Sequence, residues 1–477
     1  MNQNAKATLE KVGKLFDEQV QMLAFSKSFH DYHSKYDGVV HRSHDSLVYA
    51  VALRKYKIDI QRADRLIDAV LKLQDLREDS PYFGLWPWYL EESIDEMSPP
   101  DFNYADFCGK ELALSVVYGY DKEKVRRALE AASYCIMKRD VQPWYTNICI
   151  LGAFVTLLIG QIYEDKAVFD YGKKRLKKFM EYNQIDEYNS PTYAKIAIEE
   201  LTNIKTHIQD AECKAMAEIL LDRFWKMVME HYHPATRQWA GPMARAYTTF
   251  LKPEIYDELC MSVYGEEYDS GIVNGSINFF NTPFTCPEKY RHYFSSIEEP
   301  RVIAEQYNGK DIAYTYMTPE YTLGSFSVSD MWNQRRPLIA FWNENGLPCS
   351  FVVRLLHDGY DFCAGKLEVK QEKGVAEAQL TILSEGGDRH NDLDRIVDGK
   401  IMATDFRLSF VFENTVPQYL KVDEAVYDGK RIQASTTNRT IDYVLHKTGQ
   451  PEEIDLKSLG RTIFRFTINM EDNTLQI

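Results

Sequence analysis

The chain has 477 residues, of which 45% are hydrophobic and 27% are charged, the ordinary balance of a soluble globular protein. Because a single core seldom keeps growing at this length, we expect two domains. The formal net charge of −15, from 56 Lys and Arg against 71 Asp and Glu, argues against nucleic acid and against an anionic membrane surface as partners.

The start of the chain carries no pattern of an export signal. Residues 11–22 alternate as in an amphipathic helix, without a charged stretch followed by an apolar one. The longest apolar run, 148–162, is short for a membrane span and is typical of a buried helix. Eight scattered cysteines without a Cys-x-x-Cys pair are typical of reduced, buried thiols. We therefore expect a cytoplasmic protein without a metal or cofactor, and the sequence leaves open whether it is a homo-oligomer.

Apolar residues recur at three- and four-residue spacing from about residue 5 to residue 260. This period predicts a series of helices joined by short linkers. The predicted helices are 46–56, 60–76, 107–118, 122–137, 144–162, 166–182, 192–205 and 211–231. Short linkers favour antiparallel helical hairpins that pack side by side, as a closed toroid or part of one.

Two tryptophans flank a proline at Trp86 and Trp88, before the third predicted helix. Such a pair forms a rigid aromatic wall that suits a sugar ring, although large cores use tryptophan equally well. The neighbouring Glu91 and Glu92 are expected to be solvated. Asp101, a little further along, is a carboxylate that chemistry could use.

The most apolar helix opens with Trp144-Tyr145-Thr146-Asn147. We expect the polar residues Tyr145 and Asn147 to face outward at the N-terminus of this helix, where they could bind a ligand. The alternative is that Asn147 is an N-terminal turn residue that bonds its own backbone.

The segment Asp-Glu-Tyr-Asn-Ser-Pro-Thr-Tyr occupies positions 186–193. Pro191 fixes its own φ, so Ser190 is predicted to cap a helix that begins at Pro191. Glu187, Asn189 and Tyr193 then surround a helix start with groups able to act as acid, base or charge-stabilising donor. The alternative is a well-capped helix with surface tyrosines.

A loop rich in cationic and phenolic groups follows the last strong helix, at positions 231–247. It contains Gly, Pro and four residues of interest: His233, Trp239, Arg245 and Tyr247. Binding residues collect in loops of this kind. A surface loop with an aromatic plug is the alternative interpretation.

The hydrophobic period becomes two from about residue 300 onward, with turn signals such as Asn308-Gly309 and Asp428-Gly429. The predicted strands are 312–317, 351–356, 366–370, 378–383, 406–412, 441–445 and 462–468. They predict an antiparallel sheet sandwich. Near the start of this sheet region in the sequence, Arg335 and Arg336 could clamp a carboxylate or form an interdomain salt bridge.

The Trp-Tyr-Thr-Asn helix start, the later Tyr-bearing loop and the C-terminal sheet region together resemble the (α/α) toroid polysaccharide lyases and their heparinase II/III-like relatives. The Glu-Tyr-Asn-Ser-Pro-Thr-Tyr and Ala-Gly-Pro-x-x-Arg-x-Tyr segments also resemble a set of uncharacterised bacterial and fungal toroid proteins. The resemblance implies an α+β multidomain protein. An (α/α) toroid with the catalytic cleft would occupy residues 1–300, and an antiparallel β-sandwich residues 301–477.

The resemblance also implies a reaction, β-elimination beside a uronic acid. Asn147 would neutralise the carboxylate, Tyr247 would act as base and acid, and Arg245 would partner a carboxylate or phenolate. Asn189 and Tyr193 would line the same cleft. Toroid lyases usually place a His shortly before the catalytic Tyr, whereas this loop has Met243, so His233 is the candidate to replace it.

Two other functions fit the same fold, because fold alone does not fix a reaction. A toroid glycoside hydrolase would use Glu187 as acid and Asp101 as base. A non-catalytic sugar-binding protein would use Trp86, Trp88 and Trp239 as stacking platforms. In each case the expected ligand is an oligosaccharide, and a short one, because an acidic protein repels a long polyanion.

Overall fold

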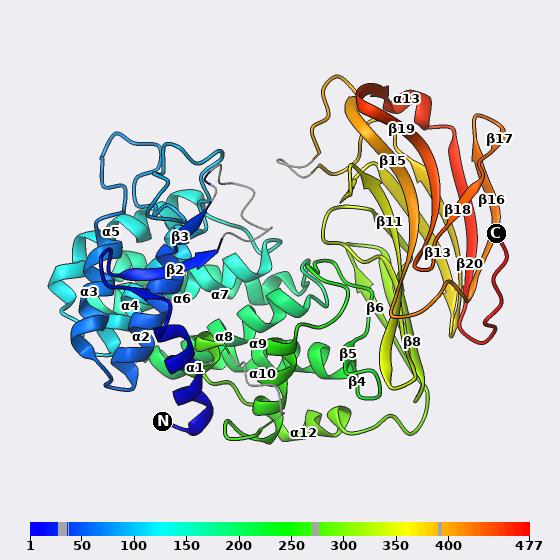
Figure 1. The fold of residues 1–477 in the computed structure, drawn as a ribbon. Helices are drawn as coiled ribbons and strands as arrows, with labels where there is room; N and C mark the ends of the chain where they lie inside the picture. The colour runs from blue at the N-terminus through cyan, green and yellow to red at the C-terminus, as the bar shows by residue number, and fades with distance from the viewer. Residues whose placement is uncertain (27–35, 37, 270–275, 390–393) are drawn as a thin grey trace. The chain divides into compact units, whose positions relative to one another are not determined.

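The computed structural model describes residues 1–26, 36, 38–269, 276–389 and 394–477, with the helices preceding the long strands along the chain (Figure 1). The chain divides into two compact units. Unit 1 comprises Met1–Gln184, Lys195–Phe224 and Pro253–Cys286, and unit 2 comprises Ile185–Ala194, Trp225–Lys252 and Pro287–Ile477. Two segments from the helical half of the sequence therefore belong to the unit that contains the large sheets.

Unit 1 consists mainly of helices. Their bounds are α1 (Gln3–Gly13), α2 (Ser43–Lys55), α3 (Ile60–Leu71), α4 (Tyr104–Val117), α5 (Lys122–Arg139), α6 (Thr146–Tyr163), α7 (Lys166–Tyr182), α8 (Pro191–His207), α9 (Ala211–Glu230), α10 (Pro253–Tyr264) and α11 (Ile277–Asn281). The boundary between the units falls within α8 and α9. The predicted helix positions are confirmed, and α10 and α11 are additional.

The helices of unit 1 fall into an inner and an outer set. α2, α4 and α6 are buried along most of their length and pack against one another in that order, whereas α3 buries one stripe, Ala63, Leu66, Ile67 and Val70. Each inner helix packs against the outer helix that follows it, in the pairs α2 with α3, α4 with α5 and α6 with α7. An apolar stripe on one helix set and all-round burial on the other are what a double ring of hairpins requires. The predicted toroid of helical hairpins is confirmed.

The closest helical hairpin depends on glycine. A Cβ placed at Gly160 of α6 would lie 2.5 Å from the backbone N of Phe169 in α7, and one at Gly172 would lie 2.6 Å from Thr156 Oγ1. Neither position has room for a side chain. Among the described residues, α6 is the one helix long and apolar enough to span a membrane by length and composition, and 83% of that stretch is buried inside the protein.

The helix predicted over residues 11–22 is wrong. α1 begins earlier, where Asn2 caps it by accepting from Ala5 N, and it ends at Gly13. Glycine is a poor helix former, and the following backbone is satisfied in a small sheet of β1 (Phe16–Asp17), β2 (Met22–Ser26) and β3 (Val39–His41). The helix predicted over residues 60–76 is shorter in the structure, because α3 ends at Leu71.

Unit 2 contains two large antiparallel sheets (Figure 1). Within the described residues, the nine-stranded sheet has the order β18-β19-β15-β11-β10-β8-β7-β6, with β12 paired to β11, and the six-stranded sheet has the order β17-β16-β20-β14-β13-β9. The strands are β6 (Arg301–Tyr307), β7 (Asp311–Met317), β8 (Tyr321–Phe326), β9 (Val328–Asp330), β10 (Leu338–Glu344), β11 (Leu347–His357), β12 (Tyr360–Asp361), β13 (Gly365–Glu372), β14 (Val375–Ile382), β15 (Lys400–Glu413), β16 (Leu420–Tyr427), β17 (Lys430–Arg431), β18 (Ala434–Thr436), β19 (Thr440–Asp455) and β20 (Thr462–Asn469).

One apolar core contains residues from both sheets, among them Phe351 and Phe410 of the larger sheet and Leu367 and Phe466 of the smaller one. In β13 and β20 of the smaller sheet, alternate residues enter this core while most of the others are half-buried, as in a sandwich. The predicted antiparallel β-sandwich is confirmed. Short elements complete the chain: β4 (Tyr232–His233) and β5 (Gln238–Trp239) pair with each other, and α12 (Glu288–Arg291), a 3-10 turn (His292–Phe294) and α13 (Leu456–Leu459) lie in connections.

Candidate active site

The loop that follows β5 is fixed against the strands of unit 2. Thr315 Oγ1 donates to the carbonyl of Gly241 at 2.6 Å, and a Cβ at Gly324 would lie only 1.7 Å from that same oxygen. Met243 and Arg336 exchange two backbone hydrogen bonds, of 3.1 and 2.9 Å. These contacts leave the backbone around Arg245 little freedom, so the side chains of the loop are held in fixed positions.

The 185–194 segment is tied to this loop by one buried amide. Asn189 has a positive φ of 48°, and its Nδ2 donates to the carbonyls of Ala240 at 2.6 Å and Pro242 at 2.9 Å. Its Oδ1 accepts from Trp239 Nε1. Every polar atom of the Asn189 side chain is thus engaged within the protein, and both Asn189 and Trp239 are buried. This differs from the expectation that Asn189 lines a cleft and that Trp239 is a stacking platform.

The predicted cap at the start of α8 is confirmed. α8 begins at Pro191, and Ser190 Oγ accepts from Tyr193 N at 3.2 Å. The cap fixes the first turn, and this turn carries Tyr193 toward the loop that contains Tyr247.

Tyr193, Arg245 and Tyr247 form a chain of hydrogen bonds. The two phenolic oxygens are 2.6 Å apart, and Arg245 Nη2 donates to the Tyr193 oxygen at 3.0 Å. The guanidinium also lies over the Tyr193 ring at 4.7 Å and over the Trp332 ring at 4.9 Å. Its Nε donates to Gln334 Oε1 at 2.8 Å. Arg245 is therefore held on several sides, with its charge directed at a phenol.

One end of the chain has a fixed direction. Arg245 can only donate, so the Tyr193 oxygen accepts from it. Between the two phenols either hydroxyl can be the donor, because the Tyr193 oxygen has a second acceptor site. Tyr193 is 8% exposed, whereas Tyr247 is only partly buried, so Tyr247 is the more accessible end of the chain.

Glu187 balances the charge of Arg245. Its Oε1 lies 3.4 Å from Arg245 Nη1, and its side chain is 5% exposed. A buried guanidinium without a carboxylate partner would be costly, so this ion pair keeps Arg245 in place.

His233 is buried and both its ring nitrogens have partners. Nδ1 lies 2.8 Å from Thr236 Oγ1 and Nε2 lies 2.9 Å from the carbonyl of Thr318. Burial lowers the pKa of His233 to about 4, so the ring is neutral at pH 7. The structure therefore uses His233 to hold a turn, which differs from the expectation that it replaces a catalytic histidine.

Arg336 is also committed to an internal ion pair. It lies 3.3 Å from Asp361 Oδ2, and Arg354 contacts the other oxygen of the same carboxylate at 2.7 Å. Its neighbour Arg335 pairs with Asp330 at 2.5 Å. Of the two interpretations of these arginines, a salt bridge matches the contacts, although both partners lie within unit 2.

The remaining predicted site residues belong to unit 1. Trp86 is fully buried and donates its Nε1 to the carbonyl of Val70 at 3.1 Å, which makes it a core residue and not part of an open wall. Trp88 is partly buried and stacks on Tyr104. Asp101 Oδ1 accepts from the backbone N of Asn103 at 2.9 Å.

Asn147 is 1% exposed, near the start of α6, where an outward-facing side chain was expected. The neighbouring Tyr145 is partly buried, and its hydroxyl accepts from Asn103 Nδ2 at 3.2 Å. Since Asn147 belongs to unit 1 and Tyr247 to unit 2, their meeting in one cleft stays a prediction.

Unit 1 also contains a charged cluster that sequence reasoning missed. Lys110 Nζ of α4 lies 2.9 Å from Glu199 and from Glu200 of α8, and 3.0 Å from its neighbour Glu111. All four side chains are at most 6% exposed. Burial raises the pKa of Glu200 to about 7, although Lys110 opposes this shift. The available signal was a pair of charged dipeptides, Lys110-Glu111 and Glu199-Glu200, inside otherwise apolar helical patterns.

In unit 2 the missed residues are Trp332 and Gln334, which contact Arg245. They lie beside Arg335 and Arg336, which the sequence analysis considered as a carboxylate clamp or a salt bridge. Over the described ranges, no group of three or more His, Cys, Asp or Glu side chains is arranged to hold a metal ion.

The geometry defines a toroid-and-sandwich protein with a phenol–guanidinium site in the unit that carries the sheets. The family described as "Domain of unknown function (DUF8769)" matches residues 6–270, and the chain belongs to this family. No curated protein matches the chain.

Several solved structures show a distant likeness. A Streptomyces coelicolor A3 chondroitin AC lyase in complex with chondroitin sulphate has 8% identity and a TM-score of 0.45, covering 98% of this chain and 79% of that one. Heparinase III has 9% identity and a TM-score of 0.36, covering 100% and 86%. The endoglucanase CelQ from Clostridium thermocellum, complexed with cellotriose, has 10% identity and a TM-score of 0.29, covering 92% and 72%. At these values the likeness carries no argument about reaction or substrate.

Proposed function

We propose that the protein is a lyase that cleaves a uronic-acid-containing oligosaccharide by β-elimination, with Tyr247 as base and acid. The observation that supports this is the chain from Arg245 through Tyr193 to the Tyr247 oxygen. A phenol serves as a base only when the negative charge on its oxygen is stabilised. A Tyr247 phenolate can only accept, so the Tyr193 hydroxyl would donate to it, with the Arg245 guanidinium behind that donor.

The reaction follows from these roles. Tyr247, as phenolate, takes the proton from C5 of the uronic acid, and the electron pair forms a C4–C5 double bond as the bond from C4 to the glycosidic oxygen breaks. The leaving oxygen then takes the proton from Tyr247, which returns to the phenolate. Proton transfer by a positioned side chain contributes about 10²–10⁴-fold in rate. Tyr193 stabilises the charge on Tyr247 before proton abstraction and after proton return.

The uronate carboxylate must be neutralised while C5 carries developing negative charge. The resemblance gives this role to Asn147, a residue of unit 1 that is 1% exposed, and its part in the reaction stays a prediction that the turnover of Asn147→Ala tests. Trp88 and Tyr145, partly buried aromatic residues of unit 1, stay predicted sugar-binding residues.

The substrate that fits the charge balance is a short oligosaccharide taken up into the cytoplasm. The net charge of −15 disfavours a long polyanion, whereas one or two uronates can be met by local cations. A comparison of initial rates on an unsaturated or saturated disaccharide and on its parent polymer tests this. A strong preference for the polymer would contradict it.

The decisive experiment is a screen of uronic-acid oligosaccharides followed in the near ultraviolet, where the conjugated double bond of a lyase product absorbs. Reducing-end formation is measured in parallel. We expect absorbance and reducing ends to rise together in the wild-type protein. Reducing ends without absorbance would identify a hydrolase, with Glu187 and Asp101 as the candidate acid and base. Saturable binding without either product would identify a sugar-binding protein.

A further inference from the structure

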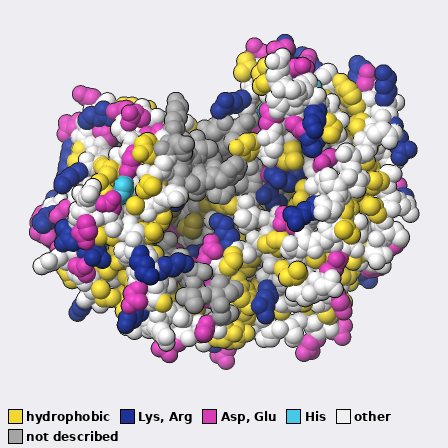
Figure 2. Space-filling model, in the orientation of Figure 1, with side chains coloured by type: hydrophobic (Ala, Val, Ile, Leu, Met, Phe, Trp, Pro, Cys, Tyr) yellow, Lys and Arg dark blue, Asp and Glu magenta, His cyan; other side chains and the backbone are white. Residues whose placement is uncertain are grey.

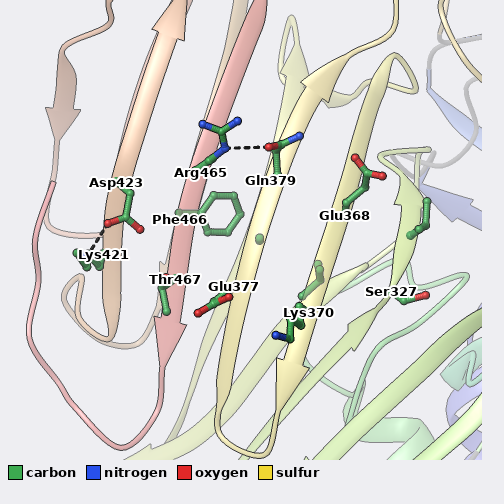
Figure 3. Close-up of a pocket in the computed structure, with 13 residues that line it drawn as sticks. Ser327, Glu368, Lys370, Glu377, Gln379, Lys421, Asp423, Arg465, Phe466 and Thr467 are labelled. Atoms are coloured by element: carbon green, nitrogen blue, oxygen red, sulfur yellow. Dashed lines mark hydrogen bonds and ion pairs between the residues drawn. The ribbon is translucent and has the colours of Figure 1, made fainter.

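The outward face of the six-stranded sheet of unit 2 carries a broad hollow of about 710 Å³ (Figure 3). It extends over β9, β13, β14, β20 and β16, and it shares no residue with the phenol–guanidinium site. Its volume is within the range of about 300–1,000 Å³ that is usual for ligand sites. Among the side chains labelled in Figure 3, dashed lines join Arg465 to Gln379 and Lys421 to Asp423.

Strand register orders these side chains into two rows that cross four strands. The first row is Glu368, Gln379, Arg465 and Glu424, and the second row is Lys370, Glu377, Thr467 and Lys421. Neighbouring strands lie about 4.8 Å apart, so each row extends across ~14 Å of sheet. We call these eight residues the polar grid.

The two rows differ in how their groups are used. In the first row Arg465 donates to Gln379 Oε1 at 2.9 Å and pairs with Glu424. In the second row, within the part of the chain that the structure describes, Lys370, Glu377 and Thr467 make no side-chain hydrogen bond or ion pair, and Lys421 pairs with Asp423. The second row therefore presents an ammonium donor, a carboxylate acceptor and a hydroxyl that are available to a ligand.

The charges select the class of ligand. Three cations, Lys370, Lys421 and Arg465, and three acids, Glu368, Glu377 and Asp423, line the hollow, so its formal charge is zero. An anionic or cationic polymer would meet as much repulsion as attraction there. A neutral chain of hydroxyl groups can donate to Glu377 and accept from Lys370, because each hydroxyl does both.

We propose that the polar grid binds a neutral oligosaccharide lying across the strands. The strand spacing of about 4.8 Å is close to the advance of one pyranose ring in an extended chain, so successive rings meet successive side chains of the second row. The floor of the hollow includes the apolar side chain of Val328 and the CH groups of Thr467, which suit the faces of sugar rings. The site would hold a neutral glycan on the protein without taking part in catalysis.

The test is affinity electrophoresis of the full chain in gels that contain hydroxyethylcellulose, mixed-linkage β-glucan or glucomannan, with polygalacturonate as the anionic comparison. We expect retardation by at least one neutral polymer and none beyond background by polygalacturonate. Calorimetry with the hexasaccharide of the retarding polymer then gives the affinity. Lys370→Ala/Glu377→Ala/Thr467→Ala should bind about tenfold more weakly or worse, because three hydrogen-bonding groups are lost.

Two control variants test whether the polar grid, and no other surface of the protein, binds the polymer. Lys400→Ala/Glu453→Ala removes an exposed ion pair of the other sheet and should bind like the wild type, and Tyr247→Phe should too, because the grid excludes the proposed catalytic site. Both multiple variants should keep the wild-type circular dichroism spectrum and melting temperature. Equal retardation of the grid variant and the wild type overturns the proposal. The proposal is also overturned if polygalacturonate alone retards the protein, or if no neutral polymer does. It is overturned as well if the grid variant loses self-association while no sugar binds the wild type.

Discussion

Each unit of this protein contains a cluster of charged side chains, and the two clusters differ in whether they include a residue that is accessible from outside. In unit 1, Lys110 is surrounded by Glu111, Glu199 and Glu200, and the whole group is enclosed. In unit 2, the chain from Glu187 through Arg245 and Tyr193 reaches Tyr247, a partly exposed residue. A closed cluster can stabilise or destabilise a fold, whereas a cluster that ends at an accessible proton carrier can also act on a ligand.

On the face drawn in Figure 2, acidic and basic side chains are interspersed and do not gather into one field. Long-range attraction is therefore weak on this face, and specific chemistry must come from local arrangements such as the Arg245 chain.

The largest effect is expected at the open end of the unit 2 chain. Tyr247→Phe removes one oxygen and leaves the ring, so turnover on a confirmed substrate should fall about 10²–10⁴-fold while the melting temperature stays within a few degrees. The measurement is the rate of ultraviolet absorbance. Tyr134→Phe, on the exposed surface of α5, is the matched control and should keep the wild-type rate. Near-normal turnover by Tyr247→Phe would remove this loop from the mechanism.

A substitution in the Lys110 cluster should lower the stability of the protein. Lys110→Met leaves three buried carboxylates without their cation, so unfolding free energy should fall by about 3–5 kcal/mol. Urea unfolding followed by the helical circular dichroism signal measures this loss. Lys166→Met removes an 84% exposed lysine from an ion pair with Asp170 and should cost less than about 1 kcal/mol. Equal losses in the two variants would mean that the Lys110 cluster is no more than a surface-like ion pair.

Tyr193→Phe tests the link between the cation and the open end. Loss of the hydroxyl removes the donor to Tyr247 and the acceptor for Arg245, so kcat should fall about 10–100-fold while KM changes less than about threefold. Steady-state kinetics on the same oligosaccharide separate the two parameters. A change confined to KM would instead assign Tyr193 to sugar binding alone.

The smallest expected effect is a dependence of stability on pH. Burial raises the pKa of Glu200 from its ordinary 4.5 to about 7, and Lys110, Glu199 and Asn203 are the groups that face it at hydrogen-bonding distance or through their charges. Between pH 4.5 and 7 the folded protein then binds more protons than the unfolded chain. Its stability falls as pH rises through this window, by roughly 1–3 kcal/mol, because each unit of the pKa shift is about 1.4 kcal/mol.

Melting curves from pH 4.5 to 7.5 measure this slope. Glu200→Gln should flatten it, because the amide does not titrate, whereas the exposed Glu218→Gln should leave it unchanged. A slope that survives in Glu200→Gln would place the titrating group elsewhere.

The sequence by itself determined the elements and the segments that matter. The change of period from three or four to two identified the helical region and the sandwich, because side-chain burial follows local backbone geometry. The Ser190-Pro191 start of α8 followed from the fixed φ of proline and from capping. The segments 186–193 and 231–247, which carry Glu187, Tyr193, Arg245 and Tyr247, were among those singled out from sequence, and their contact was expected only from the resemblance.

Only the tertiary structure decided which polar groups within those segments are used up inside the protein. Asn189, Trp239 and His233 looked as available as Tyr247, but each bonds to partners that lie tens of residues away. Such pairing depends on long-range packing, which no local pattern encodes. The same holds for Lys110 with Glu199, and for the rows of the polar grid, because strand register joins residues that the sequence keeps far apart.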